Sequence, residues 1–283
     1  MKPSFIFFGT SDYAVIVLEA LIAEGYIPKL VVTTPDKPAG KHLKLTPPPV
    51  KSSAEKHNLE IIQPEKLKDP AVLEKIKNYN PDLSIVVAYG KIIPQAIIDL
   101  PKYKTLNLHA SLLPKLRGAS PIETAILTNE KNTGVTIMLI DELMDHGPVI
   151  MQKEVVVEPW PPTASELGER IVGHGAELLI NIIPQWIKGK ITPQSQDHTL
   201  ATYTKKIEKV DGLIDLTNDP YKNFLKIQAY ADWPKTFFFV EKNGKKVRVI
   251  IKKAEYKDGI LSILRVVPEG KKEIEYTDFM KQK

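Results

Sequence analysis

The chain has 283 residues, of which 43% are hydrophobic and 26% charged, and it carries a formal net charge of +5. That composition is typical of a soluble protein of one large domain or two, and the mild basic excess permits a polyanionic partner without requiring one. The absence of cysteine excludes disulfides, thiolate metal sites and a cysteine nucleophile, and it suits a cytoplasmic enzyme. The apolar start breaks at Gly9, which favours a first strand over a signal peptide, and no apolar run approaches the length of a membrane span.

Strand, helix and strand alternate at the N-terminus. Residues 4–8 predict a buried strand, residues 12–24 an amphipathic helix, and residues 29–33 a second strand. This order predicts an α/β fold with a Rossmann-like, doubly wound and mostly parallel sheet. The turn after the first strand lacks the G-x-G-x-x-G fingerprint, which argues against a nicotinamide or flavin dehydrogenase.

Residues 35–50 form a loop rich in proline and lysine. It is long for a connection within a compact domain, so it is expected to be functional or disordered. Its basic residues are Lys37, Lys41, His42 and Lys44. A solvated surface loop would carry the same charges.

The chain then continues to alternate between expected helices and strands. Helices are predicted at 50–57, 69–78 and 94–100, and strands at 60–62, 82–88 and 105–109. Asp69 is expected to cap the second of these helices, with Pro70 at its first position. The strand at 82–88 is the most hydrophobic of the chain and is therefore expected at the centre of the sheet.

Two polar side chains lie at the end of the strand at 105–109. Asn107 and His109 are two residues apart, so their side chains point to the same face of an extended strand. An amide and an imidazole on one face, where a parallel strand opens into a loop, could act as oxyanion donor and proton handler. A hydrogen-bonded core histidine beside a turn-forming asparagine is an alternative that this stretch alone leaves open.

Four elements are expected between residues 121 and 187. They are a helix at 121–127, an antiparallel pair of strands at 134–140 and 149–155, and a long helix at 163–187. Thr163 and Glu166 predict a capping box at the start of the long helix. Pro184 is expected to kink or end it.

The composition shifts after residue 187. Residues 188–206 are polar and lack periodicity, as an inter-domain linker does, so the expected domains are 1–187 and 207–283. The second domain is expected to hold a helix at 220–229 and short strands at 236–240, 246–252, 259–266 and 273–276, a pattern typical of a small β-barrel. Lys246 and Arg248 could line a phosphate-tracking face or protect a strand edge.

A combination of motifs resembles the folate-dependent formyltransferases. In that family an Asn-x-His strand end runs into an SLLPxxRG loop, and an aspartate follows in a later turn. Here these are Asn107 and His109, the loop at 111–118, and Asp145. The resemblance runs from residue 5 to the end of the chain and implies a catalytic domain followed by a barrel akin to an OB-fold.

The long basic loop is similar to the one that, in the methionyl-tRNA formyltransferases, enters the acceptor end of the initiator tRNA and typically reads PDRPAGR. Both arginine positions hold lysine here, which keeps the charge for phosphates but loses the planar, bidentate fork. The resemblance implies that initiator methionyl-tRNA is the partner. Its implied contacts are Lys37, Lys41, His42, Lys44, Lys246 and Arg248.

The implied reaction moves a formyl group from N10 of the co-substrate 10-formyltetrahydrofolate to the α-amino group of methionyl initiator tRNA, in support of translation initiation. Asn107 would donate to the oxyanion, His109 would polarise the formyl oxygen and shuttle the proton, and Asp145 would orient His109. The implied folate slot is formed by Tyr89, Gly90, Ser111, Leu112, Leu113 and Pro114. No metal is expected, because the six histidines show no ligand spacing.

Two positions depart from the family pattern. Ser11 stands where proline is usual, and Pro148 follows Gly147 where many members carry aspartate. Pro148 cannot supply a carboxylate, which leaves Asp145 as the local acid and Asp141 as a fallback.

Three alternatives remain open. A glycinamide ribonucleotide formyltransferase would share the catalytic residues but lack the barrel and the long loop. A sugar-nucleotide N-formyltransferase can keep the barrel, so the loop at 35–50 is the feature that discriminates. The third alternative is a non-catalytic RNA-binding protein on an enzyme scaffold. Formyl transfer that is present in the wild type and lost in His109→Ala would exclude it.

The chain is expected to be a monomer without membrane attachment.

Overall fold

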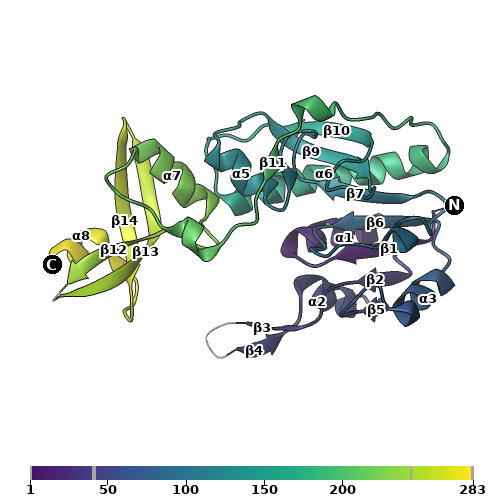
Figure 1. The fold of residues 1–283 in the computed structure, drawn as a ribbon, viewed down its shortest axis with the longest axis horizontal. Helices are drawn as coiled ribbons and strands as arrows, with labels where there is room; N and C mark the ends of the chain where they lie inside the picture. Colours follow the sequence, from purple (N-terminus) through teal and green to yellow (C-terminus); the bar gives the residue numbers. More distant parts are fainter. Residues whose placement is uncertain (1, 40–42, 243, 282–283) are drawn as a thin grey trace. The chain divides into compact units, whose positions relative to one another are not determined.

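The computed structural model describes residues 2–39, 43–242 and 244–281, and the chain forms two compact units (Figure 1). The first unit comprises residues 1–119, 133–155 and 169–203, and the second comprises residues 120–132, 156–168 and 204–283. Lys41 and His42, two of the predicted tRNA contacts, lie outside the described residues.

A seven-stranded sheet is the centre of the first unit. Its strands are β1 (Phe5–Gly9), β2 (Leu30–Val32), β5 (Ile61–Ile62), β6 (Leu83–Val87), β7 (Thr105–His109), β9 (Thr133–Leu139) and β10 (Val149–Val155). Their order is β10-β9-β7-β6-β1-β2-β5; the strands from β7 to β5 run parallel, and β9 is antiparallel to both of its neighbours. The mostly parallel α/β fold, the antiparallel pair and the central place of β6 are confirmed.

The direction in which strands are added reverses beside β1. The chain moves from β1 to β2 and β5 on one side and then crosses back to β6 and β7 on the other. Ligands of open parallel sheets bind beyond the carboxyl ends of the strands at such a point. There the Thr10 hydroxyl donates to the carbonyl oxygen of Tyr89 at 2.8 Å, which ties the turn after β1 to the turn after β6.

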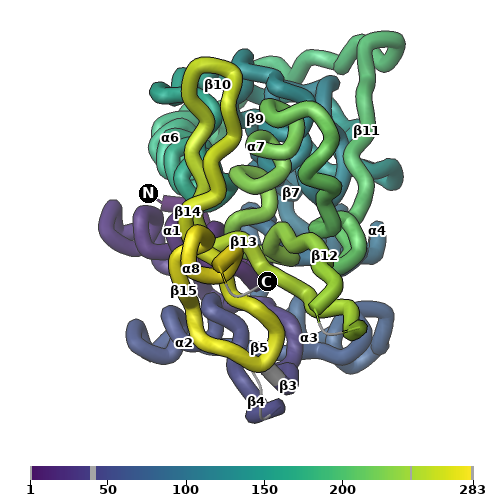
Figure 2. Tube along the Cα trace, turned by 90° about the vertical axis from the view of Figure 1, so that its left-hand side faces the viewer, coloured from purple at the N-terminus to yellow at the C-terminus, as the bar shows by residue number. Residues whose placement is uncertain are grey.

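Most of the helices begin where local sequence signals predict. They are α1 (Asp12–Ala23), α2 (Pro49–Lys56), α3 (Pro70–Asn78), α4 (Gln95–Ile98), α5 (Pro121–Leu127), α6 (Ala164–Ile187), α7 (Pro220–Ala229) and α8 (Tyr276–Lys281), with short 3-10 turns at His198–Leu200 and Lys209–Gly212. Asp69 caps α3 by accepting from the backbone N–H of Ala71, and Thr163 and Glu166 form the predicted capping box of α6. Helices α1 and α2 lie side by side (Figure 2). None of the described helices is long and apolar enough to span a membrane.

Helix α6 ends at Ile187, as predicted, and Pro184 lies inside it, so of the two effects expected of proline it does not end the helix. Ile182 and Ile183 beside it are buried, and their packing outweighs the one backbone hydrogen bond that proline removes. Helix α8 was not predicted; its one buried residue, Phe279, joins the core of the second unit.

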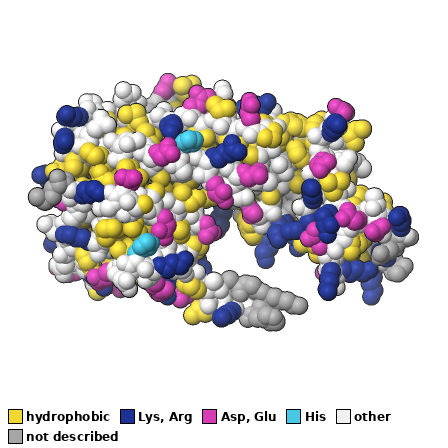
Figure 3. Space-filling model, turned by 180° about the vertical axis from the view of Figure 1, so that it is seen from behind, with side chains coloured by type: hydrophobic (Ala, Val, Ile, Leu, Met, Phe, Trp, Pro, Cys, Tyr) yellow, Lys and Arg dark blue, Asp and Glu magenta, His cyan; other side chains and the backbone are white. Residues whose placement is uncertain are grey.

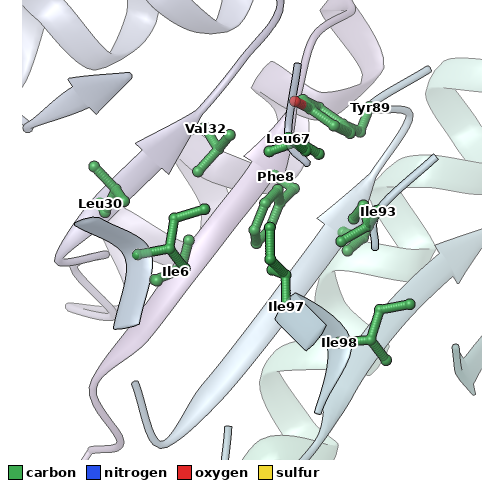
Figure 4. Packing of buried hydrophobic residues seen from close by; sticks show 11 residues of the cluster. Ile6, Phe8, Leu30, Val32, Leu67, Tyr89, Ile93, Ile97 and Ile98 are labelled. Carbon is green, nitrogen blue, oxygen red and sulfur yellow. The ribbon is translucent and has the colours of Figure 1, made fainter. Parts of the chain in front are cut away.

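Both faces of the central strands are covered. Every residue of β1 and β6 is buried, as expected for strands between two layers of helices. On one face, Ile6 and Phe8 of β1 pack with Ile97 of α4 and with Tyr89 (Figure 4). This packing makes the carboxyl ends of β1 and β6 a rigid base for the loops that follow them.

The basic loop contains a hairpin of β3 (Lys37–Ala39) and β4 (Lys44–Thr46). Its root is fixed by Asp36, whose carboxylate accepts hydrogen bonds from Gln63 at 2.6 Å and from the Lys51 ammonium at 2.9 Å. These hydrogen bonds, from Gln63 first and then from Lys51, lower the pKa of Asp36 below its ordinary value. The hairpin therefore projects from an anchored base.

The second unit contains an antiparallel sheet in the order β12 (Phe237–Lys242), β13 (Lys245–Lys257), β14 (Ile260–Pro268) and β15 (Ile274–Glu275). The short C-terminal strands from which a β-barrel was predicted are present, and they form this antiparallel sheet. Asp258 and Gly259 join β13 to β14 with φ angles of 52° and 81°, the left-handed conformations that an Asp-Gly turn favours. One face of the sheet packs Val249 and Val266 against Ile227 of α7.

Candidate active site

His109 is the last residue of β7, the parallel strand that borders the antiparallel strand β9. Its side chain is 6% exposed. Its Nε2 lies 3.0 Å from the carbonyl oxygen of Leu116. A carbonyl can only accept, so Nε2 carries a proton. Its Nδ1 lies 3.6 Å from Oδ2 of Asp145, which is close enough for an ion pair but too long for a hydrogen bond. Nδ1 is therefore the ring atom that a substrate or a water can engage.

Asp145 lies in the turn between β9 and β10, and its side chain is 18% exposed. Its φ angle is 49°, a left-handed conformation that aspartate tolerates better than most residues. Its Oδ2 accepts a hydrogen bond of 2.8 Å from the backbone N–H of Gly118. The carboxylate is thereby fixed between the SLLPxxRG loop and the imidazole of His109.

Asn107 is half-buried and is paired with Val86 on one side and Met138 on the other. It lies two residues before His109 on the same strand, so both side chains emerge on one face. Within the described part of the chain, no hydrogen bond engages its side-chain amide. Its two N–H groups are thus available to a ligand beside His109.

The loop at 111–118 is held by hydrogen bonds within the loop and from β10. The Ser111 hydroxyl donates to the Lys115 carbonyl at 2.6 Å, and the Gln152 amide donates to the Leu113 carbonyl at 2.7 Å. Ser111 and Leu113 are buried, whereas Leu112 and Pro114 are half-buried. Of the four loop residues predicted to bind folate, Leu112 and Pro114 present the accessible side-chain surface.

Tyr89 lies in the core and not on the surface of the predicted folate slot. Its side chain is 2% exposed and its ring meets that of Phe8 edge-on at a centroid distance of 5.6 Å (Figure 4). Burial raises the pKa of its hydroxyl to about 12, and among the described residues that hydroxyl has no hydrogen-bond partner. The exposed neighbour Gly90, with a φ angle of 76°, offers backbone to a ligand instead.

Comparison with known proteins agrees with this geometry. Residues 1–183 match the family described as formyl transferase. The chain is 41% identical to the methionyl-tRNA formyltransferase of Thermodesulfovibrio yellowstonii over 99% of this chain and 96% of that one. It is 46% identical to the methionyl-tRNA formyltransferase of a Sulfurihydrogenibium species, over 82% of this chain and 75% of that one.

The chain belongs to the methionyl-tRNA formyltransferase family.

Solved structures show the same fold. The methionyl-tRNA formyltransferase of Clostridium thermocellum superposes with a TM-score of 0.63 at 21% identity, over 96% of this chain and 99% of that one. A 4-N formyltransferase of Francisella tularensis superposes with a TM-score of 0.66 at 20% identity, over 89% of this chain and 99% of that one. At these identities the likeness shows the shared formyltransferase fold and does not choose between acceptors.

Those predicted tRNA contacts of this formyltransferase that the structure describes lie on two hairpins. Lys37 and Lys44 are exposed on the β3–β4 hairpin. On the C-terminal sheet, the ammonium of Lys246 lies 4.5 Å from the ring centre of Phe239. Arg248 stacks on Phe237 beside it, with 3.9 Å between the guanidinium carbon and the ring centre. Figure 3 shows Lys and Arg side chains gathered on the C-terminal sheet.

Sequence reasoning missed the residues that support this formyltransferase site from the segment 194–203. That segment is polar and without periodicity, which predicts a linker, yet Gln196 is buried and bonds to the turn that holds Asp145. Arg117 belongs to the SLLPxxRG motif, but no function was assigned to it from the sequence, and it is 1% exposed. A buried arginine needs hydrogen-bond acceptors, and the local sequence does not indicate which residues supply them.

Gly147 offers a direct test of the Asp145 turn. A Cβ at this position would lie 2.0 Å from the carbonyl oxygen of Leu139, so Gly147→Ala must shift the turn. A displacement of about 1 Å at a catalytic group can cost roughly a hundredfold in rate. We expect Gly147→Ala to lower kcat by about tenfold to a hundredfold, measured by formyl transfer under saturating substrates.

Gly173 provides the matched control. It lies inside α6, where an added Cβ meets nothing within 4 Å. Gly173→Ala should leave kcat unchanged and stabilise the helix by up to about 1 kcal/mol. Equal kcat in the two variants would show that the Asp145 turn does not set the rate.

Proposed function

We propose that this chain transfers a formyl group from 10-formyltetrahydrofolate to the α-amino group of methionyl initiator tRNA. The observation that carries the proposal is the convergence of the Asp145 carboxylate, the His109 imidazole and the Gly118 N–H at the carboxyl end of β7. Membership in the methionyl-tRNA formyltransferase family supports methionyl-tRNA as the acceptor.

The chemistry requires a donor for the oxyanion and a path for one proton. The amine nitrogen attacks the formyl carbon, the bond from that carbon to N10 breaks, the amine loses a proton and N10 gains one. The Asn107 amide is free to donate to the formyl oxygen as it becomes an oxyanion, and such donors contribute about a hundredfold or more in rate. His109 adds a second donor when Nδ1 carries a proton.

The two contacts of His109 indicate how the proton moves. A ring with a single proton keeps it on Nε2, because the Leu116 carbonyl requires a donor there, and the Nδ1 lone pair then faces the Asp145 carboxylate. A doubly protonated ring satisfies both neighbours. We infer that Nδ1 gives its proton to N10 as the bond breaks, and that Asp145 accepts the amine proton through water and stabilises the cationic ring.

The folate slot is assigned to the surface beside Leu112, Pro114 and the Gly90 backbone. These groups offer apolar side chains and open main chain around the carboxyl ends of β6 and β7. Apolar walls with a few fixed polar groups are typical of sites for small co-substrates. The Tyr89 ring is assigned to the core beside Phe8 and not to a wall of this slot.

The tRNA is assigned to the β3–β4 hairpin of the catalytic domain, residues 1–187, and to the basic sheet of the C-terminal domain, residues 207–283. Lys246 and Arg248 keep their charges over aromatic rings, an arrangement that suits phosphates and exposed bases. The proposal includes action in the cytoplasm, as a monomer and without a metal. Sedimentation velocity and metal analysis of the active enzyme test the last two points.

Removing the hairpin charges should weaken tRNA use alone. We expect Lys37→Ala combined with Lys41→Ala to raise KM for methionyl-tRNA, and to reduce the salt dependence of log KM by about one unit of slope per lost phosphate contact. KM for the folate should not change, because the hairpin carries no folate contact in this assignment. Lys77→Ala, on the exposed face of α3, is the control and should alter neither constant.

The decisive assay for the acceptor offers labelled 10-formyltetrahydrofolate with four acceptors in parallel. These are methionyl initiator tRNA, methionyl elongator tRNA, glycinamide ribonucleotide and an amino sugar nucleotide. We expect transfer to the initiator tRNA to exceed that to each of the others in kcat/KM. A preference for the amino sugar nucleotide would replace the proposal by sugar N-formyl transfer.

A further inference from the structure

The segment 194–203, here called the strap, is bonded to both loops of the active site. At one end, the backbone groups of Gln194 and Val149 exchange two hydrogen bonds of 2.8 Å at the start of β10. At the other, the hydroxyl and the carbonyl of Thr202 accept from the backbone N–H groups of Leu116 and Arg117 at 2.8 and 2.9 Å. A segment expected to be only a linker thus joins the Asp145 turn to the SLLPxxRG loop.

Gln196 lies between these ends and bonds to the Asp145 turn with its side chain. Its Nε2 donates to the carbonyl oxygen of Asp145 at 2.9 Å and to that of Gly147 at 2.7 Å. Both amide hydrogens are therefore used on the turn that sets the direction of the Asp145 carboxylate. Asp145 has a φ angle of 49°, so the turn benefits from external hydrogen bonds that hold it in this conformation.

The orientation of the Gln196 amide is fixed by Arg117. The guanidinium donates from Nε at 3.1 Å and from Nη2 at 2.6 Å to Oε1 of Gln196. Because arginine has no acceptor atoms, Oε1 must face it and Nε2 must face the turn. The amide therefore has one orientation only.

Arg117 is itself held without a carboxylate. Its side chain is 1% exposed, and no carboxylate of the described residues lies within ion-pair distance of it. Its Nη2 also lies 2.9 Å from Nδ1 of His198, which must accept and so carries no proton at that atom. The His198 ring stacks on that of His146, whose Nδ1 is 2.7 Å from the Asp141 carboxylate. A buried cation whose hydrogen bonds go to neutral acceptors lowers the stability of the fold. Such a residue is therefore a candidate for a functional role.

We propose that Gln196, oriented by the buried Arg117, is a positioning residue that holds the Asp145 carboxylate against His109. The strap is then a part of the catalytic site, and its role rests on the function proposed for Asp145. Gln196 touches no substrate; it acts through the backbone of the turn.

Gln196→Glu separates positioning from folding. The variant keeps an oxygen for Arg117, now as a charge-assisted pair, but it turns an oxygen toward the carbonyls of Asp145 and Gly147 in place of two donors. Gln196→Met removes both sets of bonds and leaves the buried guanidinium without its main acceptor. Positioning therefore predicts that both variants lose activity although only Gln196→Met loses stability. A purely structural role predicts that activity follows the thermal midpoint.

The test measures kcat, both KM values and the thermal midpoint for Gln196→Glu, Gln196→Met and the matched control Gln185→Glu, an exposed glutamine of α6 that lies outside the strap. We expect Gln196→Glu to lower kcat by about tenfold to a hundredfold, with both KM values within about threefold and the midpoint retained. The control should match the wild type. A Gln196→Glu variant with wild-type kcat, or one that does not fold, would overturn the proposal.

Asp145→Asn is assayed beside these variants so that two failures are distinguishable. If Asp145→Asn is inactive while Gln196→Glu is fully active, only the positioning role fails. If Asp145→Asn keeps wild-type kcat, the function proposed for Asp145 fails and the role of Gln196 fails with it.

Discussion

Replacing His109 by alanine should lower kcat for formyl transfer by roughly 10²- to 10⁴-fold, the range typical of a general acid–base group. The variant loses the donor that polarises the formyl oxygen and the proton destined for N10. The measurement is single-turnover transfer with enzyme in excess, which isolates the chemical step from product release. The KM values should change little, because the ring is 6% exposed and offers little surface for ground-state binding.

The control for this variant is His174→Ala. His174 is a half-buried histidine of α6 that contacts Lys153 and Glu177, and surface pairs of this kind contribute little. It should transfer formyl groups at the wild-type rate. If His109→Ala also did so, His109 would be a buried structural histidine and the catalytic assignment would be wrong.

Replacing Asn107 by alanine should lower kcat by about 10²- to 10³-fold, as for the loss of one oxyanion donor. The amide is half-buried and unengaged among the described residues, so its removal leaves no broken hydrogen bond in the protein and should change the thermal midpoint only slightly. Asn107→Asp should be at least as slow, since a carboxylate repels the developing oxyanion.

Asn181→Ala, on the exposed side of α6, is the comparison for Asn107 and should have wild-type kinetics. The distinguishing result is whether Asn107→Ala changes kcat or the folate KM. If it changed the folate KM alone, the amide would bind the folate in the ground state and would not stabilise the transition state.

Local signals accounted for much of the fold. The cap at Asp69 and the capping box of Thr163 and Glu166 form as predicted, because each depends on atoms within three residues. The alternation of strand side chains placed Asn107 and His109 on one face for the same reason. The Asp258-Gly259 turn follows from the backbone preferences of its two residues.

Long-range packing decided the features that sequence reasoning did not reach. The polar pattern of 194–203 predicts a linker, but the acceptor that Arg117 needs is Gln196, 79 residues away. Pro184 remains helical because the buried residues Ile182 and Ile183, directly before it, hold this part of α6 against the core. Tyr89 belongs to a motif at the folate slot, yet its ring fills a space in the core beside Phe8.

The short distance between His109 and Asp145 is also set by long-range packing. The two residues are 36 positions apart in the chain, and a sequence motif can include both without giving their distance. The structure supplies 3.6 Å between Nδ1 and Oδ2. Their joint action in the reaction is a separate matter that rates must decide.

The most direct measurement is therefore a double-mutant cycle on single-turnover formyl transfer to methionyl initiator tRNA, with His109→Ala, Asp145→Ala and the two combined. If the two side chains move one proton together, the double variant should be about as slow as the slower single variant, because residues that act as a unit are strongly non-additive. Rate losses that simply multiply in the double variant would show that His109 and Asp145 act independently.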